Sequence, residues 1–538
     1  MLDAQPTMLR VRVQLAVMGA ITLAAVAGLL TIHSLAQAVS VEEQTAIAAG
    51  AVTARSGVWP VTGYPYFEMP MWPLMLAGLF TWCDELLLGS RLVSVAAATG
   101  CAGLLMWAAL RRLHALSTLG KFALAGIAAV LLVCSPLYVN ATGCALPGDV
   151  AAMSMVLSVL AGFAAMKASG RWQATAWAAA CGVACGLATA LWPMYAPASA
   201  VLLLLLPCGP AISAGRRATL LLSAVAGAAA AMAPTAWLLS QHSGMVWFAT
   251  SELPLGRWLS SSSWDAGEAL ASPAQRATLE ALGREPLMWV PLAAFALLVV
   301  LAGVLAQRGG PVKRPPRTLL EIVIVVLAAG VTAVAGYVST PAGPAQLFAA
   351  MPLVVLATVL CAAYVRGCGG ERIRVTATTV YIGAGLAVIV PGMQEWSQRG
   401  SRFQWSSSPV ALHRAAAQEL GATVLGGHVL TLRPALALEA GAKVYLPLMP
   451  GEASWRWSSS MSGEQCESLG LITPSQLGPM VRQTPPTAVV LGRHPSTAEQ
   501  PLRSFVRHHR YHSRRLLAGE TLWVPYTVIA GATAHVQP

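Results

Sequence analysis

Charged side chains are scarce in this sequence. Only 10% of its 538 residues are Asp, Glu, Lys or Arg, whereas 56% are hydrophobic and the mean hydropathy is +0.63. Soluble globular domains carry about 25% charged residues, so this composition excludes an ordinary soluble protein and indicates a chain that crosses a membrane many times. We attribute the net charge of +12 to basic cytoplasmic loops. No motif that mixes aromatic and basic residues suggests nucleic acid as a partner.

Several familiar signatures are also missing. The ten Cys residues are scattered, mostly through apolar runs, and form no disulfide framework. The sequence has no Walker A, Rossmann, HExxH or GxSxG motif. The three histidines of RHHRYH (507–512) have no thiol or carboxylate nearby. We interpret them as a basic helix end and predict no metal site there.

Apolar runs of about twenty residues predict a polytopic α-helical membrane protein with about eleven transmembrane helices. The predicted spans are 13–35, 86–110, 122–139, 149–167, 174–191, 196–207, 220–239, 287–306, 319–338, 346–364 and 375–391. Basic residues precede the first span and follow every even-numbered one, which places the N-terminus in the cytoplasm and the loops 36–73 and 240–286 outside. We prefer an uncleaved first span to a signal peptide and expect a multi-pass protein of the inner (plasma) membrane. Residues 71–83 are too short to span and are expected to form an interfacial or re-entrant helix.

The composition changes at residue 394, after which charged and polar residues become more frequent. Short strands are predicted within 423–432, 442–448, 487–492 and 521–526, and helices within 411–420, 474–483 and 498–510. Alternating strands and helices favour at least partly parallel pairing. We therefore expect a transmembrane domain over 1–393 and a small soluble α/β domain over 394–538, on the extracytoplasmic side.

Acidic residues gather around the segment from Val41 to Met75. Glu42 and Glu43 follow the first span, Glu68 lies in YFEMPMWP, and Asp149 opens a later helix in LPGD. Carboxylates at a membrane face can activate a hydroxyl group. The alternative is a set of ordinary solvated acids, because helix N-termini attract acidic residues and Asp is a favoured N-cap.

One basic residue also stands out. Arg91 lies near the start of the second span. A charge at membrane depth is costly, so such a residue is usually functional or reaches along its apolar stem to the interface.

The order of a first helix, an acidic pair, a short helix, YFE-x-P and a hydrophobic return resembles the GT-C membrane glycosyltransferases. The most similar type is the aminoarabinose and dolichyl-phosphate-mannose protein mannosyltransferase group. This resemblance implies a GT-C fold and a sugar donor carried on polyprenyl phosphate, reached from the membrane lipid. It also implies sugar transfer to an extracytoplasmic lipid, glycan or protein.

The resemblance also implies roles for single residues. Glu42 aligns with the family's catalytic base, Glu43 is its main rival, and Asp149 faces the catalytic cavity. The residues that it suggests for substrate binding are Tyr66, Glu68 and Arg91. Arg257 joins them as one of the outer residues that could hold a phosphate, the others being Arg55, His242 and Arg284. The family sometimes uses a divalent cation, and this option stays open here.

The sequence departs from the family pattern at several positions. Glu42 replaces an Asp, which moves the carboxylate by about one bond length, and a shift of about 1 Å can cost about a hundredfold in rate. Met69 replaces a Lys, and Ala345 and Gln346 stand where family members often have Arg-Tyr or His-Tyr. Because phosphate needs cationic or N–H donors, a non-catalytic family member, a transporter or a scaffold remains the alternative.

Overall fold

The computed structural model describes most of the chain. The described residues are 5–113, 118–139, 141–208, 213–241, 290–307, 316–339, 348–368, 371–424, 426–452, 455, 458, 461–492 and 497–525. The predicted outer loop 240–286 therefore lies almost entirely outside them, and Arg257, Ala345 and Gln346 lie outside them as well.

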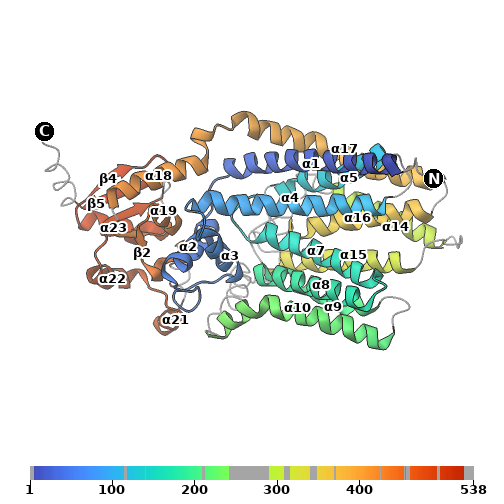
Figure 1. Cartoon of the computed structure of the whole chain (residues 1–538). Helices are drawn as coiled ribbons and strands as arrows, with labels where there is room; N and C mark the ends of the chain where they lie inside the picture. Colours follow the sequence, from blue (N-terminus) through green and yellow to red (C-terminus); the bar gives the residue numbers. More distant parts are fainter. Residues whose placement is uncertain are drawn as a thin grey trace, which may run out of the picture.

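Long apolar helices lie side by side in one bundle, with the C-terminal sheet at one end and the N-terminus at the other (Figure 1). Eight helices in the described part are long and apolar enough to cross a membrane. Shorter apolar helices at 119–133, 193–205 and 292–301 occupy the positions of the predicted third, sixth and eighth spans. The main bundle helices are α1 (Gln5–Ala36), α4 (Leu86–Arg112), α5 (Thr118–Val133), α7 (Gly148–Lys167), α8 (Arg171–Leu191), α9 (Ala196–Leu205), α10 (Ala214–Gln241), α14 (Val290–Gln307), α15 (Pro316–Ser339), α16 (Met351–Cys368) and α17 (Glu371–Arg402). The predicted polytopic helical fold is confirmed, and α17 continues as one helix past residue 394.

Two helices of the bundle pack with their backbones in contact. A Cβ built on Gly182 of α8 would lie 1.8 Å from the carbonyl oxygen of Ala224 in α10, and one on Gly186 would lie 2.4 Å from that of Ala228. Small residues spaced four apart allow this close approach in membrane helices. Glycine is therefore required at both positions for α8 and α10 to pack as they do.

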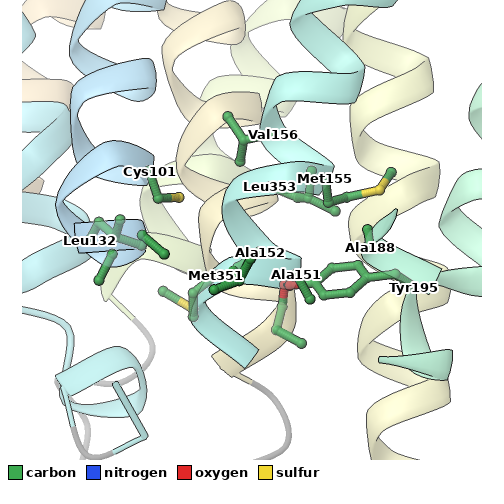
Figure 2. Close-up of a cluster of buried hydrophobic side chains, with 14 of the residues drawn as sticks. Cys101, Leu132, Ala151, Ala152, Met155, Val156, Ala188, Tyr195, Met351 and Leu353 are labelled. Carbon is green, nitrogen blue, oxygen red and sulfur yellow. The ribbon is translucent and has the colours of Figure 1, made fainter. Parts of the chain in front are cut away.

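The centre of the bundle is an apolar core around α7, which packs against α4 and α8. Figure 2 shows Met155 of α7 with Cys101 of α4 and Leu132 of α5 on one side and Tyr195 on the other. The Tyr195 hydroxyl donates a hydrogen bond to the carbonyl oxygen of Ala349, at 2.8 Å. The one polar group of this tyrosine is thus satisfied inside the core, as burial in an apolar region requires.

An ion cluster joins three helices at the end of the bundle that lies away from the sheet. Glu321 of α15 is 1% exposed, and its carboxylate lies 2.6 Å from Arg112 Nη1 of α4 and 3.1 Å from Lys167 Nζ of α7. Both cations stand in the last turn of their helix. The basic residues that mark the predicted cytoplasmic ends therefore lie together, and one acid that the basic pattern did not suggest connects them.

Two short helices, α2 (Val41–Ser56) and α3 (Met71–Phe80), lie between the bundle and the C-terminal sheet (Figure 1). They pack closely, because a Cβ on Gly50 of α2 would lie 2.7 Å from Leu76 Cβ of α3. The ten residues of α3 are too few to cross a membrane. Its length agrees with the predicted interfacial or re-entrant helix.

The C-terminal part carries a five-stranded sheet in the order β2-β1-β3-β5-β4. Its strands are β1 (His428–Thr431), β2 (Lys443–Val444), β3 (Ala488–Leu491), β4 (Tyr511–Arg515) and β5 (Thr521–Pro525). Its main helices are α18 (Pro409–Val424), α19 (Pro434–Glu439), α21 (Gly463–Ser468), α22 (Leu477–Gln483) and α23 (Gln500–His508). β1 pairs in parallel with β2 and β3, whereas β5 pairs antiparallel with β3 and β4. The partly parallel α/β arrangement is confirmed, but β4 was not predicted.

The sheet part is joined to the helical part by polar contacts. Arg55 Nη1 of α2 donates a hydrogen bond to the Leu438 carbonyl oxygen at the end of α19. The Glu439 carboxylate accepts from the Leu87 backbone N–H of α4, at 3.4 Å. These contacts hold α19 against the C-terminal end of α2 and the N-terminal end of α4.

Candidate functional site

The acidic pair stands in the first turn of α2, where its two members have different surroundings. The Ser40 hydroxyl caps the helix by accepting from the Glu43 N–H at 3.1 Å, and the Glu43 carboxylate accepts in return from the Ser40 N–H at 3.4 Å. This reciprocal capping box fixes where the helix begins. Glu43 is fully buried, whereas Glu42 is exposed.

Arg91 is the principal partner of Glu43. Arg91 Nε lies 2.7 Å from Glu43 Oε1 and Nη2 lies 2.8 Å from Oε2, so the pair is bidentate, and both side chains are 0% exposed. The guanidinium also donates to the carbonyl oxygens of Ser34, of Gln37 at 2.9 Å and of Ala38 at 3.3 Å. Arg91 therefore binds the end of α1 to the start of α2, and its full burial excludes the snorkelling alternative.

The loop between α6 (Pro136–Val139) and α7 joins this pair to Asp149. The Ala145 N–H donates to Glu43 Oε1 at 2.7 Å. Two residues earlier, the Gly143 N–H donates to Asp149 Oδ2 at 2.9 Å, and the Thr142 hydroxyl donates to Asp149 Oδ1 at 2.7 Å. Glu43 and Asp149 thus hold the same loop from opposite sides.

The simple N-cap alternative for Asp149 is wrong. The N-cap of α7 is Pro147, and Asp149, which is 2% exposed, turns back to the loop that precedes the helix. Gly143 in this loop has a φ of +82°, a conformation that side chains with a Cβ rarely adopt. Its carbonyl oxygen accepts a hydrogen bond from the Ser34 hydroxyl. The loop conformation therefore depends on both a glycine and a buried aspartate.

Cys144 lies among four of the residues that the sequence pointed to. Burial raises the pKa of its thiol to about 12. The charge of Glu43 adds to the rise, Arg91 opposes it, and Asp149 and Glu42 add further. The structure thus brings Glu42, Glu43, Arg91 and Asp149 close to one thiol.

Tyr66 and Glu68 form a second group on the same outer segment. The Tyr66 hydroxyl is 3.4 Å from Glu68 Oε2, the ring is 2% exposed, and Glu68 itself is exposed. Burial, with the Glu68 charge as a smaller cause, raises the pKa of Tyr66 well above its ordinary value. Tyr66 therefore serves as a neutral hydrogen-bond donor at physiological pH.

A cation site was left open by the sequence. Among the residues that the structure describes, no three His, Cys, Asp or Glu side chains come together as metal ligands. Both oxygens of Asp149 accept hydrogen bonds from the loop, and both oxygens of Glu43 face Arg91. These two carboxylates therefore do not fit a metal site.

Four residues of this region were missed in the sequence: His33, Gln37, Ser40 and Cys144. Cys144 Sγ donates to Gln37 Oε1 at 2.9 Å, and Gln37 Nε2 lies 2.6 Å from His33 Nε2. Residues four apart lie on one face of a helix, so His33 and Gln37 could have been read as a polar pair. Ser40 and Glu43 could likewise have been read as a capping box.

Solved structures provide the comparison that identifies the fold. The crystal structure of ArnT from Cupriavidus metallidurans bound to undecaprenyl phosphate superposes with a TM-score of 0.58 at 14% identity, covering 94% of this chain and 97% of that one. The chain has the fold of the GT-C membrane glycosyltransferases. The apo state of the same ArnT gives a TM-score of 0.56 at 13% identity and the same coverage.

A more distant match is the Archaeoglobus fulgidus oligosaccharyltransferase, with a TM-score of 0.48 at 11% identity, covering 88% of this chain and 69% of that one. No family model and no curated protein matches the sequence. At these identities the likeness establishes the GT-C fold alone.

Proposed function

We propose that this protein is a membrane glycosyltransferase that moves a sugar from a polyprenyl-phosphate carrier to an extracytoplasmic acceptor. The observation that carries the proposal is an exposed carboxylate, Glu42, fixed beside a buried ionic cluster at the outer end of a GT-C helical bundle. The carrier is inferred from the ArnT structure that holds undecaprenyl phosphate.

Glu42 is the better choice of general base within the acidic pair. Glu43 is bound by Arg91 and by the Ala145 N–H, so it could accept a proton only by giving up a buried ion pair. A base must reach the hydroxyl that it activates, and a fully buried carboxylate cannot. Glu43 and Arg91 therefore position Glu42, and Asp149 positions the loop beside it.

The reaction follows from these roles. Glu42 takes the proton of an acceptor hydroxyl as its oxygen attacks the anomeric carbon of the donor sugar. The bond between that carbon and the phosphate oxygen breaks, and polyprenyl phosphate leaves with the bonding electrons. The configuration at the anomeric carbon is inverted, because attack and departure occur on opposite faces.

The leaving phosphate needs a cation or N–H donors. Arg91 was a candidate, but its guanidinium already contacts Glu43 and three carbonyl oxygens. We propose that Arg257, on the outer segment 240–286, supplies this charge, and that Tyr66 and Glu68 bind sugar hydroxyls. Arg91 then contributes to binding only by holding α1 and α2 in place.

A second candidate function is a non-catalytic lipid-phosphate-binding or scaffold protein. The occupied Arg91 favours it, together with Met69 in the place of the family's lysine. Both candidates predict the same membrane placement: an inner (plasma) membrane protein with a cytoplasmic N-terminus and an extracytoplasmic C-terminal domain.

Transfer assays separate the two candidates. The purified protein is incubated with a panel of polyprenyl-phosphate sugars, and Glu42→Gln and Asp149→Asn are compared with the wild type. We expect transfer that is lost in Glu42→Gln while folding is retained. Full activity in Glu42→Gln would exclude it as the base, and phosphate-lipid binding without turnover of any donor would favour the scaffold.

A further inference from the structure

A cavity of about 410 Å³ opens between the outer end of α1 and the segment that joins α17 to α18. This volume falls within the range of about 300–1,000 Å³ that is typical of small-ligand sites. The polar and aromatic side chains that line it are His33, Gln37, Phe403, Gln404, Ser407 and Ser408. Glu42, Asp149 and the other acids of the proposed reaction centre do not line it, so the cavity is a separate space.

One wall of the cavity is held rigidly. His33 is fully buried, and its ring meets Trp396 of α17 edge to face with 5.2 Å between the centroids. Gln37 fixes the other edge of the ring, with 2.6 Å between Gln37 Nε2 and His33 Nε2. A polar wall that is already ordered loses little conformational entropy when a ligand binds.

The opposite wall is polar and more open. Gln404 and Ser407 are exposed, and the Ser407 hydroxyl makes only a long contact of 3.3 Å to the Gln404 carbonyl oxygen. Ser408 is buried, and its hydroxyl caps α18 by accepting from the Ala411 N–H at 3.2 Å. Gln404 and Ser407 are therefore the residues of this wall that can bind a ligand without a cost to the helix cap.

The chemistry of the lining indicates the class of ligand. The amides of Gln37 and Gln404 and the hydroxyl of Ser407 can both donate and accept hydrogen bonds, and Phe403 adds an aromatic surface. None of the lining residues that the structure describes is Lys, Arg, Asp or Glu. These described residues offer an anionic group such as phosphate no cation, whereas their amides and hydroxyl match the many hydroxyls of a neutral sugar.

The cavity is also connected to the proposed reaction centre. Gln37 Oε1 accepts from Cys144 Sγ at 2.9 Å, and the Gln37 carbonyl oxygen accepts from Arg91 Nη1 at 2.9 Å. The same residue therefore forms part of the cavity wall and part of the frame that positions Glu42.

From this geometry we infer that the cavity is a saccharide subsite that binds an uncharged sugar unit through Gln37, Gln404, Ser407 and the aromatic face of Phe403. The inference deepens the proposed function and rests on it for the biological source of the sugar. That source is either the acceptor glycan or the sugar of the donor.

Binding is tested first without any turnover. The full-length protein in lipid nanodiscs is examined by saturation-transfer-difference NMR with the methyl glycosides of glucose, mannose, galactose and arabinose. We expect signals from at least one glycoside, reduced at least about fivefold in Gln404→Ala and in Ser407→Ala. Ser406→Ala is the matched control, because Ser406 is exposed in the same segment but does not line the cavity.

Two results would overturn the inference. One is that no glycoside gives a signal, or that the signal is equal in wild type, Gln404→Ala and Ser407→Ala. The other is displacement of the glycoside by equimolar inorganic phosphate, which would make the site an anion site. A protein that binds glycosides here but transfers no sugar would refute the proposed transferase and leave the subsite standing.

In an active preparation, kinetics identify the source of the sugar. A Ser407→Ala variant with a raised KM for the acceptor and an unchanged KM for the donor assigns the subsite to the acceptor, and the reverse pattern assigns it to the donor. Both KM values unchanged in Ser407→Ala and in Gln404→Ala would contradict the subsite.

Discussion

Replacing Glu43 by Gln should separate the structural acid from Glu42, the proposed catalytic base. Glu43 and Arg91 are both 0% exposed and form a bidentate pair, with contacts of 2.7 and 2.8 Å. Glu43→Gln keeps the shape of the side chain but leaves the Arg91 charge uncompensated. Removing one partner of a buried ion pair costs about 3–5 kcal/mol, so we expect Glu43→Gln to be less stable by that amount.

The assay is unfolding of the purified protein in mixed micelles with increasing SDS, followed by circular dichroism. Arg91→Met should be destabilised similarly, and the double variant should lose much less than the sum, because replacing both members of a buried pair is often nearly neutral. The matched control is Glu42→Gln, which should keep wild-type stability because Glu42 is exposed. A Glu43→Gln protein that is as stable as wild type and inactive would refute the reasoning and make Glu43 the base.

Other changes test the surrounding structure. Gly143→Ala should be destabilised more than Gly57→Ala. Both glycines have positive φ, +82° and +67°, but only at Gly143 would the new Cβ meet a neighbour, Ser34 Cβ at 3.0 Å. Equal unfolding midpoints for the two variants would contradict this expectation. Glu321→Gln should also be destabilised, but less than Glu43→Gln, because Arg112 and Lys167 are 21% and 44% exposed; the same unfolding assay compares them. Because the pKa of Cys144 is raised to about 12, its thiol stays protonated at pH 8. Iodoacetamide should therefore modify Cys144 on the order of a thousandfold more slowly than free glutathione, and the rate should rise as pH rises. Peptide mass spectrometry measures the rate of modification, and equal rates for Cys144 and glutathione would show that the pKa of the thiol is not perturbed.

Most of the bundle could be predicted because apolar length is a local property. Runs of about twenty apolar residues predicted the long helices, and basic residues marked the ends that meet at Glu321. The four predicted strands combine β-branched and apolar residues in short runs. β4 was missed because its residues, YHSRR, are mostly exposed and basic. Such residues are typical of an edge strand, and only its pairing with β5 makes it a strand.

The site could be predicted only in part, for a physical reason. The position of the acids at one end of the bundle follows from the spans. The division of roles within the acidic pair depends on Arg91, 48 residues away along the chain, and on the Ala145 N–H, 102 residues away from Glu43. No local pattern encodes these long-range contacts. The spacing from Ser40 to Glu43 marks Glu43 as a capping residue, but it does not show that Glu43 is buried against Arg91 while Glu42 is exposed.

The capping box at Ser40 has a consequence for how this region can vary. Glu42 stands two residues after the cap, and the cap and Arg91 fix the start of α2 from the side of α1. Insertions or deletions in the loop after Gly57 would therefore change the far end of the outer segment without shifting Glu42. The loop can therefore vary in length while the Glu42 carboxylate keeps its place.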